Sequence, residues 1–180
     1  KKDLVILSDY GHGFVTENIA KFLCKNSNFL IINAQSNAAN TGFSSIKKYR
    51  NFDALIINER ELREELRNKD EKIEHLMKHI SKKYLIKNVI TTRGSEGSIL
   101  YDFKKNRFYY CVAFANNIID KIGSGDVMMS VIAGFLKLKS DPGLALFISS
   151  IAAGKSVESL ANSHPVNKLS LKKSLSHILN

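Results

Sequence analysis

The chain has 180 residues, which is enough for one domain with a hydrophobic core. Its 44% hydrophobic and 24% charged residues are typical of a globular protein and exclude a disordered or fibrous one. No apolar run reaches the length that a bilayer requires, and the apolar run after Lys1-Lys2-Asp3 is short, so we expect neither a membrane span nor a secretory signal.

The net charge of +10 is compatible with nucleic acid, anionic lipid or phosphorylated metabolites as partners. The lysines are scattered in pairs such as Lys47-Lys48 and Lys172-Lys173, with no interleaved aromatic residues. We interpret them as a solvated surface and expect no nucleic acid and no membrane partner. The two cysteines, Cys24 and Cys111, lie far apart without metal-like spacing, which favours structural thiols in a reducing, cytoplasmic compartment.

The first half of the chain alternates short apolar runs with amphipathic stretches. We predict strands at 4–7, 29–33, 54–57 and 88–92, and helices at 16–25 and, in two pieces, at 59–81. The first strand is apolar throughout, which predicts burial on both faces inside a sheet. No strand precedes it as a partner, so we expect the chain to be a piece of a longer protein. Thr16 is the expected cap of the first helix, and Ile19, Phe22 and Leu23 its apolar face.

The second half has a different pattern. Runs at 98–103 and 107–114, separated by Lys104-Lys105-Asn106, predict an antiparallel hairpin. The remainder predicts helices at 126–139, 142–160 and 170–179, with Pro142 in a first helical turn. We therefore expect one α/β domain over 1–180, with a mostly parallel sheet flanked by helices and an antiparallel hairpin at its edge.

The strongest chemical signal is Asp120-Lys121-Ile122-Gly123-Ser124-Gly125-Asp126, which opens an apolar helix. Glycines at 123 and 125 permit a sharp turn with exposed N–H groups, and at a helix N-terminus such groups bind anions. A carboxylate in the first turn can accept the proton of an attacking hydroxyl beside that anion. The alternative is a glycine turn that only enters a helix, with Asp126 favoured by the helix dipole.

Two further motifs follow predicted strands. Asn58 ends a strand and Glu61 lies one helical turn later, so their oxygen atoms are able to hold Mg²⁺ through water. The alternative is an ordinary helix cap followed by a solvated glutamate. Thr92, Gly94 and Gly97 close another strand, and a plain turn is the alternative there.

The fourth motif, Ser8-Asp9-Tyr10-Gly11-His12-Gly13, is a glycine-rich turn after the first strand. Ligands of open α/β sheets bind at the carboxyl ends of strands, so Asp9 is a candidate substrate residue.

In their order along the chain, the four motifs resemble those of PfkB (ribokinase-like) carbohydrate kinases, and the resemblance covers 3–163. The run 120–126 resembles the family signature Asp-x-x-Gly-Ala-Gly-Asp. This resemblance implies Asp126 as the catalytic base and Gly123, Ser124 and Gly125 as an anion hole. Ser124 replaces the usual alanine. Lys121 replaces a small residue in a loop that helps some relatives bind a monovalent cation.

Asn58 and Glu61 match the family's Asn-x-x-Glu motif, which implies contacts with Mg²⁺ and the nucleotide phosphates. Thr92, Gly94 and Gly97 resemble the Thr-x-Gly-x-x-Gly loop, which implies positions near ATP, with Gly97 needed for close approach. The helical region 151–160 is expected to form one wall of the adenine pocket.

The turn at 9–13 and the run Asn40-Thr41-Gly42-Phe43 resemble the heptose-phosphate kinase branch, with His12 in the place of a lysine. This implies that Asp9 positions the substrate or stabilises the site. Family members are longer, and their N-terminal portion supplies the opening strands, the lid and most sugar contacts. We expect that portion to be missing or supplied by a partner, and an uncovered sheet edge would favour a homo-oligomer.

The sequence therefore predicts ATP-dependent phosphoryl transfer to a hydroxyl of a sugar or sugar phosphate, with ATP and Mg²⁺ as cofactors. The alternative is a non-catalytic nucleotide-binding or assembly fragment that lacks the lid and the sugar site. A basic nucleic-acid binder is a third, less favoured alternative, and it would show steeply salt-dependent binding.

Overall fold

The computed structural model describes residues 3–35, 46–115, 119–120, 122–158 and 166–179. One six-stranded sheet runs in sequence order. Its strands are β1 (Val5–Asp9), β2 (Leu30–Ala34), β3 (Ala54–Asn58), β4 (Asn88–Thr92), β5 (Ser98–Asp102) and β6 (Arg107–Cys111). Strands β1 to β4 are parallel, whereas β5 and β6 pair antiparallel. The mostly parallel sheet with a hairpin at one edge is therefore confirmed.

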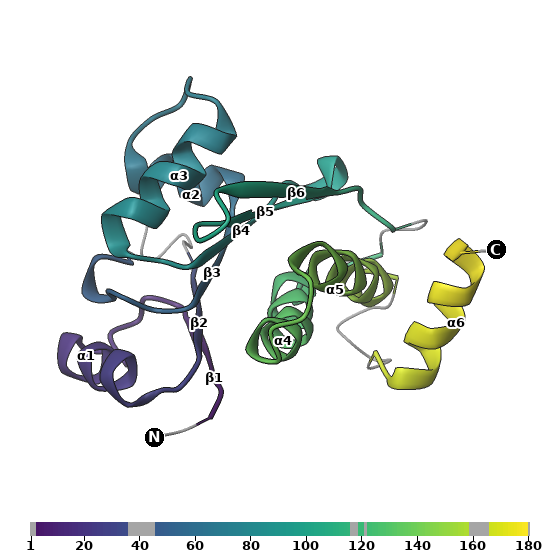
Figure 1. Ribbon diagram of the computed structural model, residues 1–180, viewed down its shortest axis with the longest axis horizontal. Helices are drawn as coiled ribbons and strands as arrows, with labels where there is room; N and C mark the ends of the chain where they lie inside the picture. The colour runs from purple at the N-terminus through teal and green to yellow at the C-terminus, as the bar shows by residue number, and fades with distance from the viewer. Residues whose placement is uncertain (1–2, 36–45, 116–118, 121, 159–165, 180) are drawn as a thin grey trace.

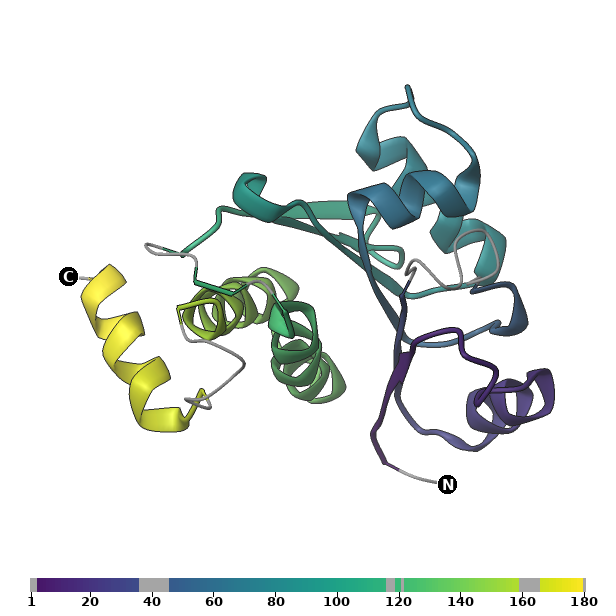
Figure 2. The same ribbon diagram turned by 180° about the vertical axis from the view of Figure 1, so that it is seen from behind.

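Helices cover both faces of this sheet (Figure 1). One face carries α1 (Glu17–Asn26), α2 (Glu59–Leu66) and α3 (Ile73–Tyr84), and the other carries α4 (Ser124–Lys137) and α5 (Pro142–Ser156). The view from behind shows the same layers, with α6 (Lys168–Leu179) beyond α5 (Figure 2). Two 3₁₀ turns, η1 (Ile46–Lys48) and η2 (Gly94–Glu96), complete the described elements. None of the helices in these ranges is long and apolar enough to cross a membrane.

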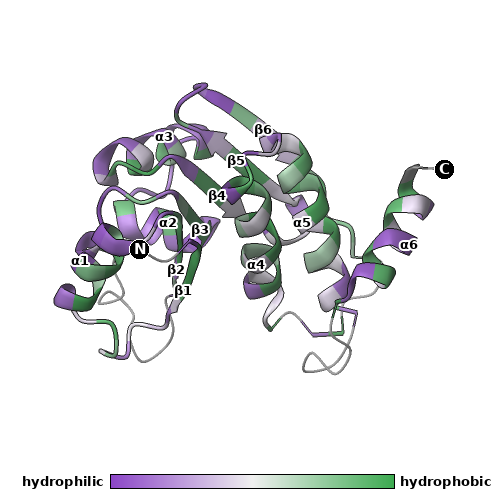
Figure 3. Ribbon diagram, turned by 60° about the horizontal axis from the view of Figure 1, so that its bottom comes forward, coloured by the Kyte–Doolittle hydropathy of each residue, from purple (hydrophilic) through white to green (hydrophobic). Residues whose placement is uncertain are grey.

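Alternate side chains of the buried strands supply two separate halves of the core, because a strand directs successive residues to opposite faces. Ile32 and Leu55 pack on the α1–α3 side, and Ile31 and Ile56 on the α4–α5 side. Figure 3 shows hydrophobic residues along much of α4 and α5. Each fully buried isoleucine contributes about 1.5–3 kcal/mol, so these rows fix which face of each strand meets which helices.

Side-chain caps fix where two of the helices begin. The Thr16 hydroxyl accepts a hydrogen bond from the Ile19 N–H at 3.4 Å, as the sequence predicted. Asp141 accepts from the Leu144 N–H at 3.0 Å, and Pro142 occupies the first turn of α5. Both caps satisfy N–H groups that have no partner inside the helix.

The prediction that the first strand is buried on both faces is wrong. In the described structure β1 pairs with β2 alone and forms one edge of the sheet. Ile6 is 41% exposed, because the helices cover this edge strand only in part. An apolar run alone does not separate an edge strand from an interior one.

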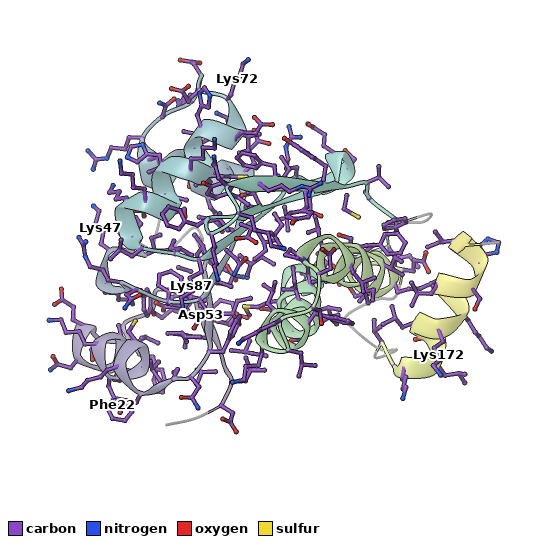
Figure 4. The ribbon with its side chains drawn as sticks, viewed as in Figure 1. Phe22, Lys47, Asp53, Lys72, Lys87 and Lys172 are labelled. Atoms are coloured by element: carbon purple, nitrogen blue, oxygen red, sulfur yellow. The ribbon has the colours of Figure 1, made fainter. Side chains whose placement is uncertain are left out.

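The predicted apolar face of the first helix is also partly wrong. Leu23 packs on the core, but Ile19 is 39% exposed and Phe22 is 63% exposed. Figure 4 shows Phe22 on the outer side of α1. Ala20 and Cys24 take the inner positions with Leu23, because residues at spacings of three and four share one stripe of a helix.

The lysines are scattered over the surface, as the sequence analysis expected, and the two cysteines are not paired with each other. Figure 4 shows Lys47, Lys72 and Lys172 on separate parts of the molecule, in η1, before α3 and in α6. Cys24 and Cys111 are free and half-buried, and burial raises the pKa of each thiol. Both thiols are therefore partly shielded from solvent, and the structural role expected from the sequence stays a prediction.

Candidate active site

Four polar side chains lie at or near the carboxyl ends of the parallel strands, on the sheet face that α4 covers: Ser8, Asn33, Asn58 and Thr92. Ser8 of β1 and Asn33 of β2 are neighbours in register, as are Asn58 of β3 and Thr92 of β4. The residue two positions before Asn58, Ile56, belongs to the core on this face. Apolar rows therefore give way to a polar edge, which is the edge where open α/β sheets bind ligands.

Helix α4 begins opposite this polar edge. Gly123 precedes it with a φ of 82°, a left-handed conformation that favours glycine. The N-cap residue Gly123 has no side chain to cap the first turn of α4, where the helix dipole favours an anion. A Cβ added at Gly125 would meet no atom within 4 Å, which means that this residue borders open space.

The Asp126 side chain extends from the first turn of α4 toward the end of β1. Its Oδ1 accepts a hydrogen bond from the Ser8 hydroxyl at 2.8 Å. Among the described residues Asp126 forms no ion pair, and it is only partly buried. A carboxylate without a cationic partner beside open space keeps its capacity to accept a proton.

A cavity of about 570 Å³ brings together the larger part of the predicted site. Its lining includes Asn58 and Thr92 from the strand ends and Glu61 from the first turn of α2. Gly123, Ser124, Gly125 and Asp126 line it from the start of α4. Tyr10, which the fourth motif contains without an assigned role, completes the lining together with Asn33 and Gln35.

A second cavity, of about 410 Å³, adjoins the first and shares Thr92, Ser124 and Gly125 with it. The predicted residues Gly94 and Gly97 line this one, with apolar groups that include Val112 and Met128. Helix α5 and the residue after it supply one wall. That wall consists of Ser150, Ala153, Gly154 and Val157. Ile151, the first residue of the predicted wall, is buried instead, and 159–160 lie outside the described residues.

Gly97 is required by the packing of the hairpin as well as by its backbone conformation. Its φ is 84°, and an added Cβ would overlap the carbonyl oxygen of Cys111 and crowd the backbone of Val112. The need for glycine at 97 is therefore explained by strand β6, without a ligand. Gly94 also has a positive φ, of 59°, but a Cβ there would meet nothing.

Glu59 connects helix α2 to the loop that precedes η2. Its carboxylate accepts hydrogen bonds from Arg93 at 2.7 Å and from Arg63 at 2.7 Å. Burial alone would raise the pKa of Glu59, but the two guanidinium groups outweigh burial and lower it. The motifs did not point to this network, which fixes the strand end of Asn58 relative to Thr92.

Asp9 does not line either cavity; it is 5% exposed, and its carboxylate is bound by other groups of the protein. Its Oδ1 accepts from the Gly11 N–H at 3.0 Å, and its Oδ2 accepts from the Tyr49 hydroxyl and the Lys48 ammonium, each at 2.7 Å. Burial raises the pKa of Asp9, but these donors outweigh burial and lower it. The carboxylate thus anchors the glycine turn after β1 to the η1 region.

Other predicted positions lie apart from the cavities or outside the described ranges. His12 is exposed, and it lines neither cavity. Lys121 and the run Asn40-Thr41-Gly42-Phe43 lie outside the residues that the structure describes.

Sequence reasoning included Ser8 in the fourth motif without giving it a role, and it missed Asn33. Asn33 is 6% exposed, lines the larger cavity, and has no side-chain hydrogen bond to any described residue. The alternation of side chains along a strand could have identified Asn33. A polar residue near the end of an apolar strand lies at the same edge as the polar residue that ends the neighbouring strand, when both point to the same face of the sheet.

The comparisons with known proteins concern the family and the fold of the chain. The model of the pfkB family of carbohydrate kinases matches residues 8–167. The sequence comparison with curated proteins finds no relative of this chain. Among solved structures, the chain is similar to ribokinase from Thermotoga maritima, at 22% identity and a TM-score of 0.73, over 97% of this chain and 57% of that one.

Two further structures extend the comparison. Ribokinase from Arabidopsis thaliana, complexed with ribose and ATP, matches at 22% identity and a TM-score of 0.72, over 88% of this chain and 51% of that one. Phosphofructokinase-2 from Escherichia coli, in complex with substrates and products, matches at 13% identity and a TM-score of 0.77, over 100% and 59%. The chain thus spans between one half and three fifths of the length of these structures, and it shares their fold. With a family model matched over 8–167, this chain belongs to the PfkB family of carbohydrate kinases.

Proposed function

We propose that this chain carries the nucleotide-binding and catalytic portion of a kinase that transfers the γ-phosphoryl group of ATP to a hydroxyl of a sugar or sugar phosphate. The observation that carries the proposal is that Asp126 and the first turn of α4 border one cavity. A proton acceptor and an anion site at one surface are what phosphoryl transfer to an alcohol requires.

In the proposed reaction, the acceptor oxygen bonds to the γ-phosphorus and the bond to the bridging β,γ-oxygen breaks. Asp126 accepts the hydroxyl proton, and ADP leaves. The N–H groups of Gly123, Ser124 and Gly125 stabilise the negative charge of the transferring group, with the dipole of α4 behind them. The lack of an ion pair at Asp126 among the described residues supports the role of base, because a cationic partner would stabilise the carboxylate and make it a weaker base.

The donor set at Asn58 and Glu61 fits Mg²⁺ with water in between. Both residues line the larger cavity and offer oxygen atoms. No group of three or more acidic, histidine or cysteine side chains gathers in the described part of the chain, so these residues offer no all-protein cage. Magnesium sites that use one or two carboxylates, water and phosphate oxygens need no such cage. When bound, Mg²⁺ neutralises charge on the phosphate oxygens.

The second cavity supports a nucleotide site next to the phosphate site. It is lined by apolar residues such as Val112, Met128 and Val157, with the hydroxyl groups of Ser98 and Ser150 in its wall. A mostly apolar pocket with a few polar groups suits a planar base. We assign Thr92, Gly94 and Gly97 to the border between this pocket and the phosphates.

The acceptor is assigned to the side of the larger cavity that Tyr10, Asn33 and Gln35 line. The motif at 9–13 resembles the heptose-phosphate kinase branch, so a sugar phosphate of that class is our first candidate. Since both oxygens of Asp9 are used within the protein, we assign Asp9 to stabilising this side of the site rather than to contacting the acceptor.

A second candidate function is a nucleotide-binding fragment without turnover. It is favoured by one observation: the chain spans 51–59% of the length of the structures compared above. The remaining parts of such kinases would then be needed for the acceptor to bind.

Calorimetry with Mg·ATP, followed by a ³¹P NMR assay with a panel of sugars and sugar phosphates, distinguishes the two functions. The kinase proposal predicts ATP binding, and formation of ADP and a sugar phosphate in equal amounts. Binding without transfer to any acceptor would favour the fragment, and absence of nucleotide binding would contradict both.

A further inference from the structure

The hydrogen bond between Ser8 and Asp126 joins two elements that are 118 residues apart in sequence. Ser8 lies one residue before the end of β1, and Asp126 lies in the first turn of α4. We infer that Ser8 is a positioning residue that holds the Asp126 carboxylate in the orientation needed to receive the acceptor's proton. This inference rests on the proposed function and adds to it a residue that neither the motifs nor the comparisons assign.

The bond uses one carboxylate oxygen and leaves the other to the acceptor. The Ser8 hydroxyl donates to Oδ1 at 2.8 Å, and the described chain gives the Asp126 side chain no other hydrogen bond. An unrestrained aspartate rotates about χ1 and χ2, so one fixed donor selects among its orientations. A hydrogen bond to a charged oxygen is also stronger than one between neutral groups.

The backbone keeps Ser8 in a defined place. Strand β1 pairs with β2 in continuous register from Val5 to Asp9, with Ser8 beside Asn33. Directly after Ser8, Asp9 is held by Gly11, Lys48 and Tyr49. The donor is therefore placed by a strand and an anchored turn, and not by a mobile side chain alone.

A second serine on α4 provides a matched control. The Ser130 hydroxyl donates at 2.8 Å to the main-chain oxygen of Asp126, is exposed, and lines neither cavity. Removing it deletes a hydrogen bond to the same residue without touching the carboxylate.

The experiment compares Ser8→Ala, Ser8→Thr and Ser130→Ala in two measurements. The first is steady-state transfer with Mg·ATP and the acceptor identified by ³¹P NMR. The second is the χ1 distribution of Asp126 from three-bond NMR couplings, which needs no turnover. For Ser8→Ala we expect kcat to fall about tenfold to a hundredfold, with an unchanged KM for ATP and averaged Asp126 couplings. Ser8→Thr should recover most of the loss, and Ser130→Ala should match the wild type in both measurements.

Two results would overturn the inference. One is a single Asp126 rotamer with unchanged kcat in Ser8→Ala. The other is a raised KM for ATP at unchanged kcat, which would make Ser8 a ligand contact. If the wild type transfers phosphate to no acceptor while Asp126 loses its fixed rotamer in Ser8→Ala, the proposed function fails and the positioning role stands.

Discussion

Asn58 and Glu61 cap each other at the start of α2. The Asn58 side-chain oxygen accepts from the Glu61 N–H at 2.8 Å, and the Glu61 carboxylate accepts from the Asn58 N–H at 3.2 Å. The two residues proposed to face Mg²⁺ thus also form a capping box. A substitution at either one can therefore act through the fold, through the ligand, or through both.

Glu61→Gln separates these two contributions. Glutamine keeps the accepting oxygen of a capping box but loses the charge, so we expect the free energy of unfolding to change by less than about 0.5 kcal/mol. Mg²⁺-dependent ATP affinity, measured by calorimetry, should fall at least about tenfold, the equivalent of about 1.4 kcal/mol. Asn58→Ala is the comparison, because it removes the cap and should cost about 1 kcal/mol of stability. Unchanged Mg·ATP affinity in a stable Glu61→Gln variant would exclude Glu61 from the phosphate site.

Asp126→Asn tests the proton acceptor. The amide occupies the same volume and can still accept from Ser8, but it does not take a proton from an alcohol at neutral pH. We expect turnover to fall by about 10²–10⁴ and ATP affinity to remain within about twofold. Initial rates of phosphoryl transfer and calorimetry with Mg·ATP measure the two quantities. Turnover close to that of the wild type would contradict the assignment of Asp126 as base.

The elements and the grouping of the motifs were accessible from the sequence, because both depend on local patterns. Apolar runs of four or five residues predicted β2, β3 and β4, and Lys104-Lys105-Asn106 predicted the hairpin that ends the sheet. Since the carboxyl ends of parallel strands lie at one edge, motifs that follow them meet there. Asn58 and Thr92 border one cavity for this reason, and the first turn of α4 brings Asp126 to the same cavity.

The sequence did not reveal the hydrogen-bond partners of the site residues, because these partners lie far away along the chain. The hydroxyl that reaches Asp126 comes from Ser8, and the donors that hold Asp9 come from Lys48 and Tyr49. No local pattern encodes these pairings. The partial exposure of β1 was missed for a related reason: composition reports that a strand is apolar, whereas its exposure depends on what packs beside it.

The glycines around the cavities serve different purposes, and alanine substitutions distinguish them. Gly125→Ala should leave stability unchanged or raise it by up to about 1 kcal/mol, since the new methyl group meets no protein atom. The same methyl group would enter the space shared by both cavities, so we expect ATP affinity to fall more than about tenfold, or about 1.4 kcal/mol.

Gly97→Ala should instead lower the free energy of unfolding by more than about 2 kcal/mol, because of its positive φ and the overlap with Cys111. Gly134→Ala, in the middle of α4 and away from both cavities, is the control and should change stability alone. Thermal unfolding with and without Mg·ATP measures all three. Normal ATP affinity in Gly125→Ala would show that the start of α4 does not approach the nucleotide.

The ion pair between Asp9 and Lys48 should make stability depend on acidic pH. Because the pKa of Asp9 is lowered in the folded protein, the pair's stabilisation is fully present above the ordinary value of 3.8. It is lost as the pH falls through the lowered folded-state value.

Lys48→Met removes the cation from a buried carboxylate, so we expect a loss of about 1–3 kcal/mol at pH 7. The difference from the wild type should shrink as the pH falls below 3.8, because protonation of Asp9 in the folded wild type removes the ion pair. Urea unfolding at pH 7, 5 and 3 measures it. Lys87→Met, which breaks the more exposed pair with Asp53 shown in Figure 4, should cost less than about 1 kcal/mol at pH 7. An equal loss of unfolding free energy in the two variants would mean that the burial of Asp9 does not make its ion pair more important for stability than an exposed pair. The turn beside Ser8 would then be held no more firmly than an ordinary surface loop.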